Sequence, residues 1–315
     1  MASTLKDLAR SYMRRHGLPP EMEQNLVKEA LHHHILSTLA DAGLTERVVF
    51  QGGTSLRLCY QGTRYSEDLD FVCGRSGEYV NEIEFEQVVD QAMDVLAKSL
   101  SKSLGLDRDQ IRCKPPKNAE SLRGENVAVS AWQIAVPIDG APSTPSSRVK
   151  IEFANVPSHD ARPMSIQAPP DLIQTPAVIM LVESPTEILA DKVIALINRP
   201  YMKYRDVWDV NFIQSRLGHQ VNRELLWDLV QRKLADYRIS DIDEVRNKLH
   251  ARVDQLKTDE TREGYRGEIS RFIPSTLMTQ TLRTNLHVYM LEESSNLLQE
   301  AERHIFAGPE GKMTP

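Results

Sequence analysis

Two aspartates two positions apart, Asp68 and Asp70, have the residue types and spacing that best fit a chemical role in this sequence. They stand in the run Asp-Leu-Asp-Phe-Val-Cys, whose alternating polar and apolar residues are typical of a half-buried strand. Side chains two apart on a strand face the same side, so the two carboxylates project together. Like charges that close repel each other. A divalent cation such as Mg²⁺, with a bound nucleoside triphosphate, would make two neighbouring carboxylates favourable. The simpler alternative is a strand edge whose aspartates face water.

A glycine pair shortly before the aspartates adds weight to the chemical interpretation. The run Arg47–Gln51 predicts a short strand, and a short helix is expected from Thr54 to Tyr60. A strand, a glycine turn and a helix N-terminus bring backbone amides close to an anion. The turn is neither a P-loop nor a dinucleotide fingerprint, because the required glycines and lysine are missing. The candidate anion-binding residues of this turn are Gly52, Gly53, Thr54 and Ser55.

Glu152 is the candidate for a third acidic ligand. It lies in the predicted strand Arg148–Val156, where Lys150 and Glu152 share one face and Ile151 and Phe153 share the other. An ordinary solvent face with a Lys/Glu pair is the alternative, so the type of residue alone leaves metal binding open.

A second group of candidates lies after a proline-rich connection. Ser184 and Glu187 form the pattern of a capping box, so Glu187 is expected to be structural. The helix that follows should run to about Asn198 and carries Lys192 among apolar neighbours. A lysine at the border of an apolar stripe either extends to water or is held against an anion.

A basic stretch follows in this otherwise acidic chain. Between Lys192 and Arg216 there are more basic than acidic residues, with two tyrosines between them, which favours contact with phosphates. The alternative is a solvated helix with an Arg205–Asp209 pair at four-residue spacing. The basic residues are Lys192, Arg199, Lys203, Arg205 and Arg216, and the acidic ones are Asp206 and Asp209.

Mixed α+β structure followed by helices is the order of elements that the patterns predict. Residues 1–180 are expected to form a domain with N-terminal helices, a long helix over 81–104 and strands over 68–73, 126–138 and 148–156. From residue 157 to 185 the prolines indicate connecting structure with one short strand at 178–182. Residues 181–315 are expected to form a helical domain that closes a cleft.

Composition limits the class of protein. The chain has 315 residues, a net charge of −6 and 3 cysteines without a C-x-x-C motif, so a disulfide scaffold and a thiolate zinc site are poor interpretations. The charge provides no overall attraction to nucleic acid, and binding there needs a local basic surface. We expect no membrane partner, no secretion signal and a cytoplasmic location. The adjacent His32, His33 and His34 point in different directions on a helix and do not converge on a metal.

Together these blocks resemble the AbiEii toxin family of nucleotidyltransferases, which is similar to the MenT toxins. The resemblance covers roughly residues 25 to 215. It rests on four segments, which are Phe50–Leu56, Arg64–Phe71, Glu187–Lys192 and Arg205–Asp209. It implies a polymerase-β-like nucleotidyltransferase domain with a mixed sheet and a helical domain behind it.

The resemblance also implies a role for each matching residue. Asp68 and Asp70 would be catalytic and hold Mg²⁺, with Glu152 as a further metal ligand. Lys192 would meet the triphosphate, Asp206 with Arg205 would complete the site, and Asp209 competes with Asp206. The implied nucleotide-binding residues are Gly52, Gly53, Thr54, Ser55, Ser66, Lys192 and Arg205.

The function implied is that of a toxin in a toxin–antitoxin or phage-defence pair, with an antitoxin as partner. The toxin would transfer nucleotides from a nucleoside triphosphate to an RNA acceptor, with the tRNA 3′ end as the first choice, and release pyrophosphate. Two alternatives stay open, a protein AMP transferase and a nucleotide-binding module without catalysis that acts through partner contacts.

Overall fold

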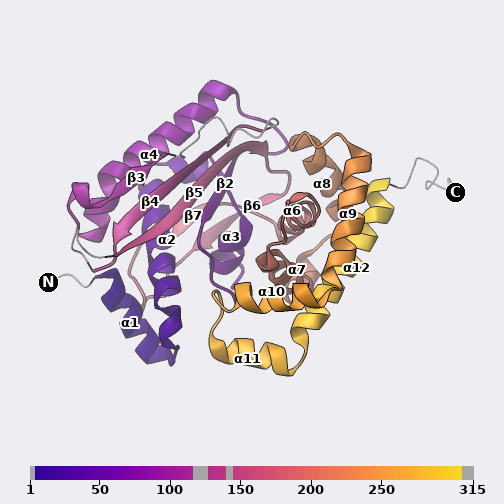
Figure 1. Cartoon of the computed structure of the whole chain (residues 1–315). Coiled ribbons are helices and arrows are strands. Elements are labelled where there is room, and N and C mark those ends of the chain that lie inside the picture. Colours follow the sequence, from indigo (N-terminus) through magenta and orange to yellow (C-terminus); the bar gives the residue numbers. More distant parts are fainter. Residues whose placement is uncertain (1–3, 116–126, 140–144, 307–315) are drawn as a thin grey trace. The chain divides into compact units, whose positions relative to one another are not determined.

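Two compact units make up the protein, and the mixed α+β class expected from the sequence is confirmed (Figure 1). The computed structural model describes residues 4–115, 127–139 and 145–306. The sheet unit contains the chain up to Glu183 together with Phe272–Pro274. The helical unit contains Ser184–Arg271 and the residues from Ser275 onward.

Within the described residues, one mixed sheet of seven strands forms the centre of the sheet unit, in the order β3-β4-β5-β2-β1-β7-β6. Strand β2 is antiparallel to β1 and parallel to β5, while β1 is parallel to β7. The strands are β1 (Val49–Gln51), β2 (Leu69–Gly74), β3 (Arg112–Lys114), β4 (Val129–Pro137), β5 (Ser146–Pro157), β6 (Ala161–Ile166) and β7 (Val178–Glu183).

Apolar residues of the three central strands form the core of this unit. The rings of Phe50, Phe71 and Phe153 stack in sequence at centroid distances of 5.3 Å, and all three are buried. These phenylalanines alternate along their strands with Gln51, Asp70 and Glu152, so a buried aromatic row on one side directs the polar row to the other side.

Helices of the sheet unit pack on each other and on the sheet. They are α1 (Leu5–His16), α2 (Glu23–Asp41), α3 (Gly52–Cys59) and α4 (Glu82–Leu104). The Asn81 side chain accepts from the amide of Glu84 and caps α4, as expected for an Asn at a helix start. Helix α2 is buried on nearly every side, and His32 and His33 belong to this buried surface. Burial lowers the pKa of His32 to about 3, which keeps its imidazole neutral.

The helical unit consists of consecutive helices with buried faces. They are α6 (Pro185–Asn198), α7 (Tyr204–Arg216), α8 (Arg223–Asp236), α9 (Ile242–Leu256), α10 (Asp259–Ile269), α11 (Ser275–Arg283) and α12 (Leu286–Phe306). Ser184 caps helix α6, because its hydroxyl accepts a hydrogen bond from the amide of Glu187. Pro185 is the first residue of the helix. Among the described residues, no helix has the length and apolar content to cross a membrane.

Two strands were not expected from the sequence. Strand β6 lies within residues 157–185, where the prolines predicted connecting structure with one strand only. It is an edge strand, and Pro163 stands opposite Leu181 of β7, so a residue without an amide hydrogen is tolerated there. Strand β3 is at the other edge and has only three residues, too few for a clear alternation.

Candidate active site

Asp68 and Asp70 stand where β2 begins, beside the end of β1. Asp70 pairs in register with Gln51 on β1 and Glu152 on β5, and Asp68 immediately precedes the strand. Both aspartates are partly exposed. Their charges converge with that of Glu152 on one ammonium group. Burial by itself lowers the pKa of Lys150, but Glu152, Asp70 and Asp68 together hold that pKa above its ordinary value.

Glu152 forms an ion pair with Lys150, two positions away on β5. The sequence placed these two side chains on one strand face, and the ion pair shows that they share it. The described residues contain no group of three or more His, Cys, Asp or Glu side chains arranged to hold a metal ion. Glu152 therefore has a cation of its own in this arrangement, and its role as a metal ligand stays a prediction.

The glycine turn at the start of α3 is shaped by the side chains around it. Gly52 has φ +78°, and a Cβ atom there would lie 2.8 Å from Oδ2 of Asp70. A Cβ atom on Gly53 would collide with the guanidinium of Arg64, whose Cζ would be 3.1 Å away, and would lie 3.3 Å from Oγ of Ser66. A carboxylate and a guanidinium thus lie against the two glycines, and a side chain at either position would have to displace them.

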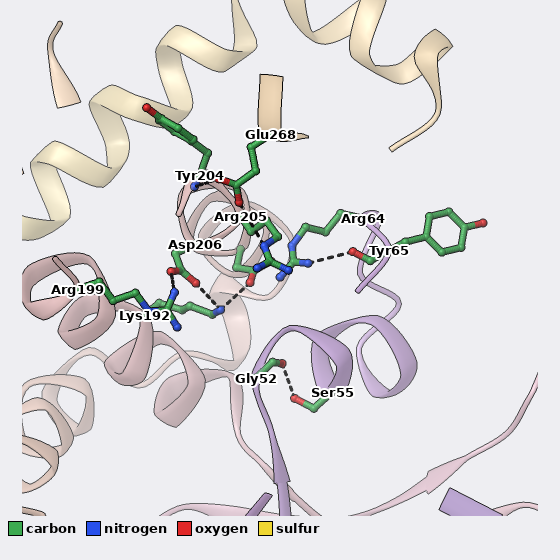
Figure 2. A network of polar contacts seen from close by, with 11 residues as sticks. Gly52, Ser55, Arg64, Tyr65, Lys192, Arg199, Tyr204, Arg205, Asp206 and Glu268 are labelled. Carbon is green, nitrogen blue, oxygen red and sulfur yellow. Dashed lines mark hydrogen bonds and ion pairs between the residues drawn. The ribbon is translucent and has the colours of Figure 1, made fainter. Parts of the chain in front are cut away.

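Thr54 and Ser55 are fully buried, and their hydroxyls have partners within the turn. The Thr54 hydroxyl donates to the backbone carbonyl of Asp68, which ties α3 to the residue that carries the first carboxylate. The Ser55 hydroxyl donates to the carbonyl of Gly52 at 2.8 Å (Figure 2). Both side chains therefore hold the shape of the turn, and the groups that face an anion would be its backbone amides.

Arg64 is a site residue to which the sequence reasoning assigned no role. It is only 5% exposed, and its Nη1 donates to the carbonyl of Tyr65 at 3.0 Å (Figure 2). Its guanidinium lies against Gly53, at the N-terminus of α3. The signal that could have found it is its place at the start of the block Arg64–Phe71, because a buried arginine beside a glycine turn is a natural phosphate ligand.

The loop before Asp68 is held by α2 and α3. Arg57 on α3 pairs with Glu29 at 2.6 Å, donates to the carbonyl of Gly62 at 2.9 Å and covers the ring of Tyr65 at 4.2 Å. On α2, Lys28 pairs with Glu67 at 2.6 Å. The imidazole of His32, also on α2, contacts the carbonyl of Glu67 at 3.2 Å. The two buried helices thus fix the backbone that presents the aspartates.

In the helical unit, Lys192 lies between two buried carboxylates (Figure 2). Its Nζ is 2.8 Å from Oδ1 of Asp206 and 2.8 Å from Oδ2 of Asp209. Arg199 forms a second ion pair with Asp206. Burial alone raises the pKa of Asp206, but the positive charges of Lys192 and Arg199 hold it below its ordinary value.

Helices α6 and α7 produce this cluster by their periodicity. Asp206 and Asp209 are three residues apart on α7 and therefore lie on one face. Of the two behaviours considered for Lys192, extension to water is wrong, because the side chain is only 10% exposed and is paired. The spacing left Asp206 and Asp209 as competitors, and Lys192 contacts both.

Arg205 points to a different partner. Its Nε lies 3.2 Å from Oε1 of Glu268 on α10, and the other carboxylate oxygen of Glu268 accepts from the amide of Tyr204 at 3.2 Å (Figure 2). Three of the five cations of the basic stretch are therefore committed to carboxylates of the same unit. Lys192 and Arg199 neutralise buried aspartates, and Arg205 pairs with Glu268.

Glu187 and Asp191 on α6 have a buried cation of their own. Lys233 on α8 lies 3.0 Å from Glu187 and 2.8 Å from Asp191, and is almost fully buried. The structural role expected for Glu187 therefore extends from the helix start to the packing of α6 on α8.

Each unit brings together some of the site residues that the sequence predicted. In the sheet unit these are the two aspartates, Glu152, the glycine turn and Ser66. In the helical unit they are Lys192, Asp206 and Asp209, while Arg205 is directed to Glu268. Two carboxylates beside a helix N-terminus and a buried guanidinium can bind a cation with a polyphosphate.

The chain was compared with protein families, curated proteins and solved structures. Residues 34–287 match the family described as "Nucleotidyl transferase AbiEii toxin, Type IV TA system". No curated protein matches the chain. Similar solved structures include JHP933 from Helicobacter pylori, with 18% identity, a TM-score of 0.43 and coverage of 90% of this chain and 97% of that one. Another is described as an H. pylori nucleotidyltransferase, with 18% identity, a TM-score of 0.43 and coverage of 88% and 97%.

The family match spans most of the chain and includes the two aspartates, Glu152, the glycine turn, Arg64 and the Lys192 cluster. A family of this kind implies a nucleotide as substrate and an antitoxin as partner. The protein is a nucleotidyltransferase and belongs to the AbiEii toxin family.

Proposed function

We propose that this enzyme transfers a nucleotide from a nucleoside triphosphate to the 3′ hydroxyl of an RNA, with tRNA as the first candidate. The observation that carries the proposal is the placement of Asp68 and Asp70 beside the glycine turn at the N-terminus of α3. In the reaction the acceptor oxygen bonds to the α-phosphorus, the bond from that phosphorus to the β-phosphate oxygen breaks, and pyrophosphate leaves. The hydroxyl proton passes to a nearby carboxylate or to water.

The donors of the sheet unit fit Mg²⁺. Carboxylate oxygens are the hard ligands that this ion prefers, and one or two of them suffice when substrate phosphates complete the coordination. Asp70 lies against Gly52, so its carboxylate is held at the turn where phosphates would bind. When bound, the ion would neutralise phosphate charge and favour ionisation of the attacking hydroxyl. Glu152 is a less direct ligand because Lys150 already holds it.

The protein groups have separate tasks under this proposal. Asp68 and Asp70 position the cation, and the backbone amides at the start of α3 together with Arg64 attract the phosphates. Thr54 fixes the spacing between the turn and Asp68 through its hydrogen bond. Positioning and charge neutralisation are the main contributions a protein makes to transfer at phosphorus.

The test is a labelling assay with purified protein, Mg²⁺, total tRNA and each of the four nucleoside triphosphates labelled at the α-phosphate. We expect one or more nucleotides to label RNA and the Asp68→Ala variant to label none. Asp94→Ala, an exposed aspartate on α4, is the matched control and should keep full activity. Equal labelling by wild type and Asp68→Ala would overturn the assignment. Label on protein bands with unlabelled RNA would select the AMP-transferase alternative instead.

A further inference from the structure

Strand register collects basic residues on the sheet face that carries Asp70. Asp70 stands beside Glu152 on β5, which stands beside Ala131 on β4. Two positions along, Lys150 on β5 stands beside Gln133 on β4, which stands beside Lys114 on β3. Partners in register share a face, so this second row leads from the carboxylates to the edge of the sheet.

A third row lies two positions further on. Arg148 on β5 stands beside Ala135 on β4, and Ala135 stands beside Arg112 on β3. Arg112, Lys114, Arg148 and Lys150 thus share one face, which we call the basic face. The residues between them are small or uncharged, so nothing bulky or acidic separates the cations along the rows.

The outer cations of the basic face are accessible. Arg112, Lys114 and Arg148 are exposed, and within the described part of the chain no carboxylate forms an ion pair with them. Lys150, by contrast, forms an ion pair with Glu152 and is attracted electrostatically by Asp68 and Asp70. The face therefore changes from negative at the site to positive at the β3 edge, in a chain whose net charge is −6.

The basic stretch between Lys192 and Arg216 differs from the basic face, because some of its cations form internal ion pairs. Lys192 and Arg199 are committed to Asp206 and Asp209 within the helical unit. Cations that already hold buried carboxylates contribute little to an external anion. The basic face, by contrast, is assembled by register from exposed cations and Lys150, which are up to 38 positions apart in the chain.

We propose that the basic face binds the sugar–phosphate backbone of the acceptor RNA and leads its 3′ hydroxyl to Asp68 and Asp70. This rests on the proposed transfer to RNA. Three strand spacings separate β3 from β2, about 14 Å in all, which is a span of a few nucleotides. The last nucleotide would lie at the carboxylates, and the preceding phosphates would contact Lys114, Arg112 and Arg148.

The charge pattern favours a phosphate backbone as the occupant. The cations form rows with regular spacing and have only Ala135 and the uncharged Gln133 between them, which suits a repeating chain of charges. The aromatic residue of β4, Trp132, is paired with buried Ile151 and so belongs to the other face. Binding there would consequently depend on phosphates and show little preference for bases.

The experiment measures RNA binding directly, without triphosphate or Mg²⁺, so that it does not depend on catalysis. Fluorescence anisotropy would follow a 5′-labelled 12-nucleotide RNA at several salt concentrations. The variant Arg112→Gln/Lys114→Gln/Arg148→Gln keeps every residue of the proposed machinery, Lys150 included. We expect its Kd to rise about tenfold to a hundredfold and its salt slope to fall by about 2, at roughly 0.7 per phosphate contact.

A second triple variant controls for net charge. Lys98→Gln/Lys102→Gln/Lys248→Gln removes the same charge from two exposed positions on α4 and a partly exposed one on α9, and should bind RNA as wild type does. Thermal unfolding of both variants checks that the folds are intact. Nucleotide binding, followed with a fluorescent triphosphate and Mg²⁺, should be unchanged in both.

The outcomes separate this proposal from the proposed function. Equal loss of RNA affinity in both triple variants, or in neither, overturns the basic face as the RNA site. Wild-type protein that labels a protein substrate and binds no RNA overturns it as well, although nucleotidyl transfer stands. RNA binding that depends on the basic face, in a protein that transfers nothing to RNA, supports the surface and refutes the proposed reaction.

Discussion

The two units each contain a pair of aspartates on one face of an element, and the pairs differ in how their charge is balanced. Asp68 and Asp70 are two residues apart at the start of a strand and are partly exposed. Asp206 and Asp209 are three residues apart on a helix, are buried and share Lys192 at 2.8 Å. The buried pair has its cation within the same unit, whereas we propose that the partly exposed strand pair binds a cation that arrives with the substrate.

The comparison shows that spacing identifies which carboxylates meet but not what they do. Both patterns bring like charges together, by the period of a strand in one case and of a helix in the other. Burial then decides the outcome, because a desolvated carboxylate needs a permanent partner. A partly exposed pair can stay charged in water and exchange its cation with each reaction cycle.

Removing one charge from the strand pair should have the largest effect on activity. Asp70→Asn should lower nucleotidyl transfer at least about a thousandfold, since it removes a ligand for the charge that develops in the reaction. Its free energy of unfolding should change little, because relief of the repulsion with Asp68 offsets the lost attraction to Lys150. Labelling kinetics and urea unfolding measure the two effects, and a large loss of stability would mean that Asp70 is structural.

The helical pair should respond in the opposite way to loss of its cation. Lys192→Met leaves Asp206 and Asp209 buried with less compensation, and we expect a loss of about 3–5 kcal/mol in the free energy of unfolding. Adding Asp206→Asn and Asp209→Asn to that variant should restore most of it. Lys98→Met, at an exposed ion pair, is the control and should change stability by at most about 1 kcal/mol. A Lys192→Met variant as stable as wild type would contradict the structural role.

Alanine at Gly52 and at Gly43 distinguishes two effects of a glycine substitution, which are backbone strain and displacement of Asp70. Gly52→Ala and Gly43→Ala both place alanine at positive φ, +78° and +70°, and each should cost about 1–2 kcal/mol of stability. Only at position 52 does the new Cβ meet Asp70, at 2.8 Å, whereas nothing lies within 4 Å of it at position 43. We expect Gly52→Ala alone to lose activity, by about a hundredfold. Equal activity of the two variants would show that the turn does not position Asp70.

The smallest effect concerns pH. The pKa of Asp206 is lower in the folded protein than its ordinary value of 3.8, so its contribution to stability is complete above that value. The contribution is lost as the pH falls from 3.8 through the folded pKa. Urea unfolding should therefore show the difference between wild type and Asp206→Asn shrink below pH 4. A difference that is constant down to acid pH would mean that Asp206 has no favourable ion pair.

Alternation and helical spacing were enough to predict the main elements of the site. The strand at Asp68, the helix after Asn81 and the helix from Pro185 to Asn198 all lie where the sequence indicated. The edge strands β3 and β6 were missed, because a three-residue strand and one that contains Pro163 carry almost no periodic signal. Arg64 received no role because its meaning depends on Gly53, eleven positions earlier.

Which side chains share a face within one element can be predicted from the order of the amino acids, since periods of 2 and 3.6 residues are local properties of the backbone. The partners of those side chains are visible only in the folded protein: Lys150 for Glu152, Lys192 for both Asp206 and Asp209, and Arg64 for Gly53. The fold also joins the cations of β3, β4 and β5 into one face. Such pairings depend on strand register and helix packing, which arise from contacts between distant residues that no local pattern encodes.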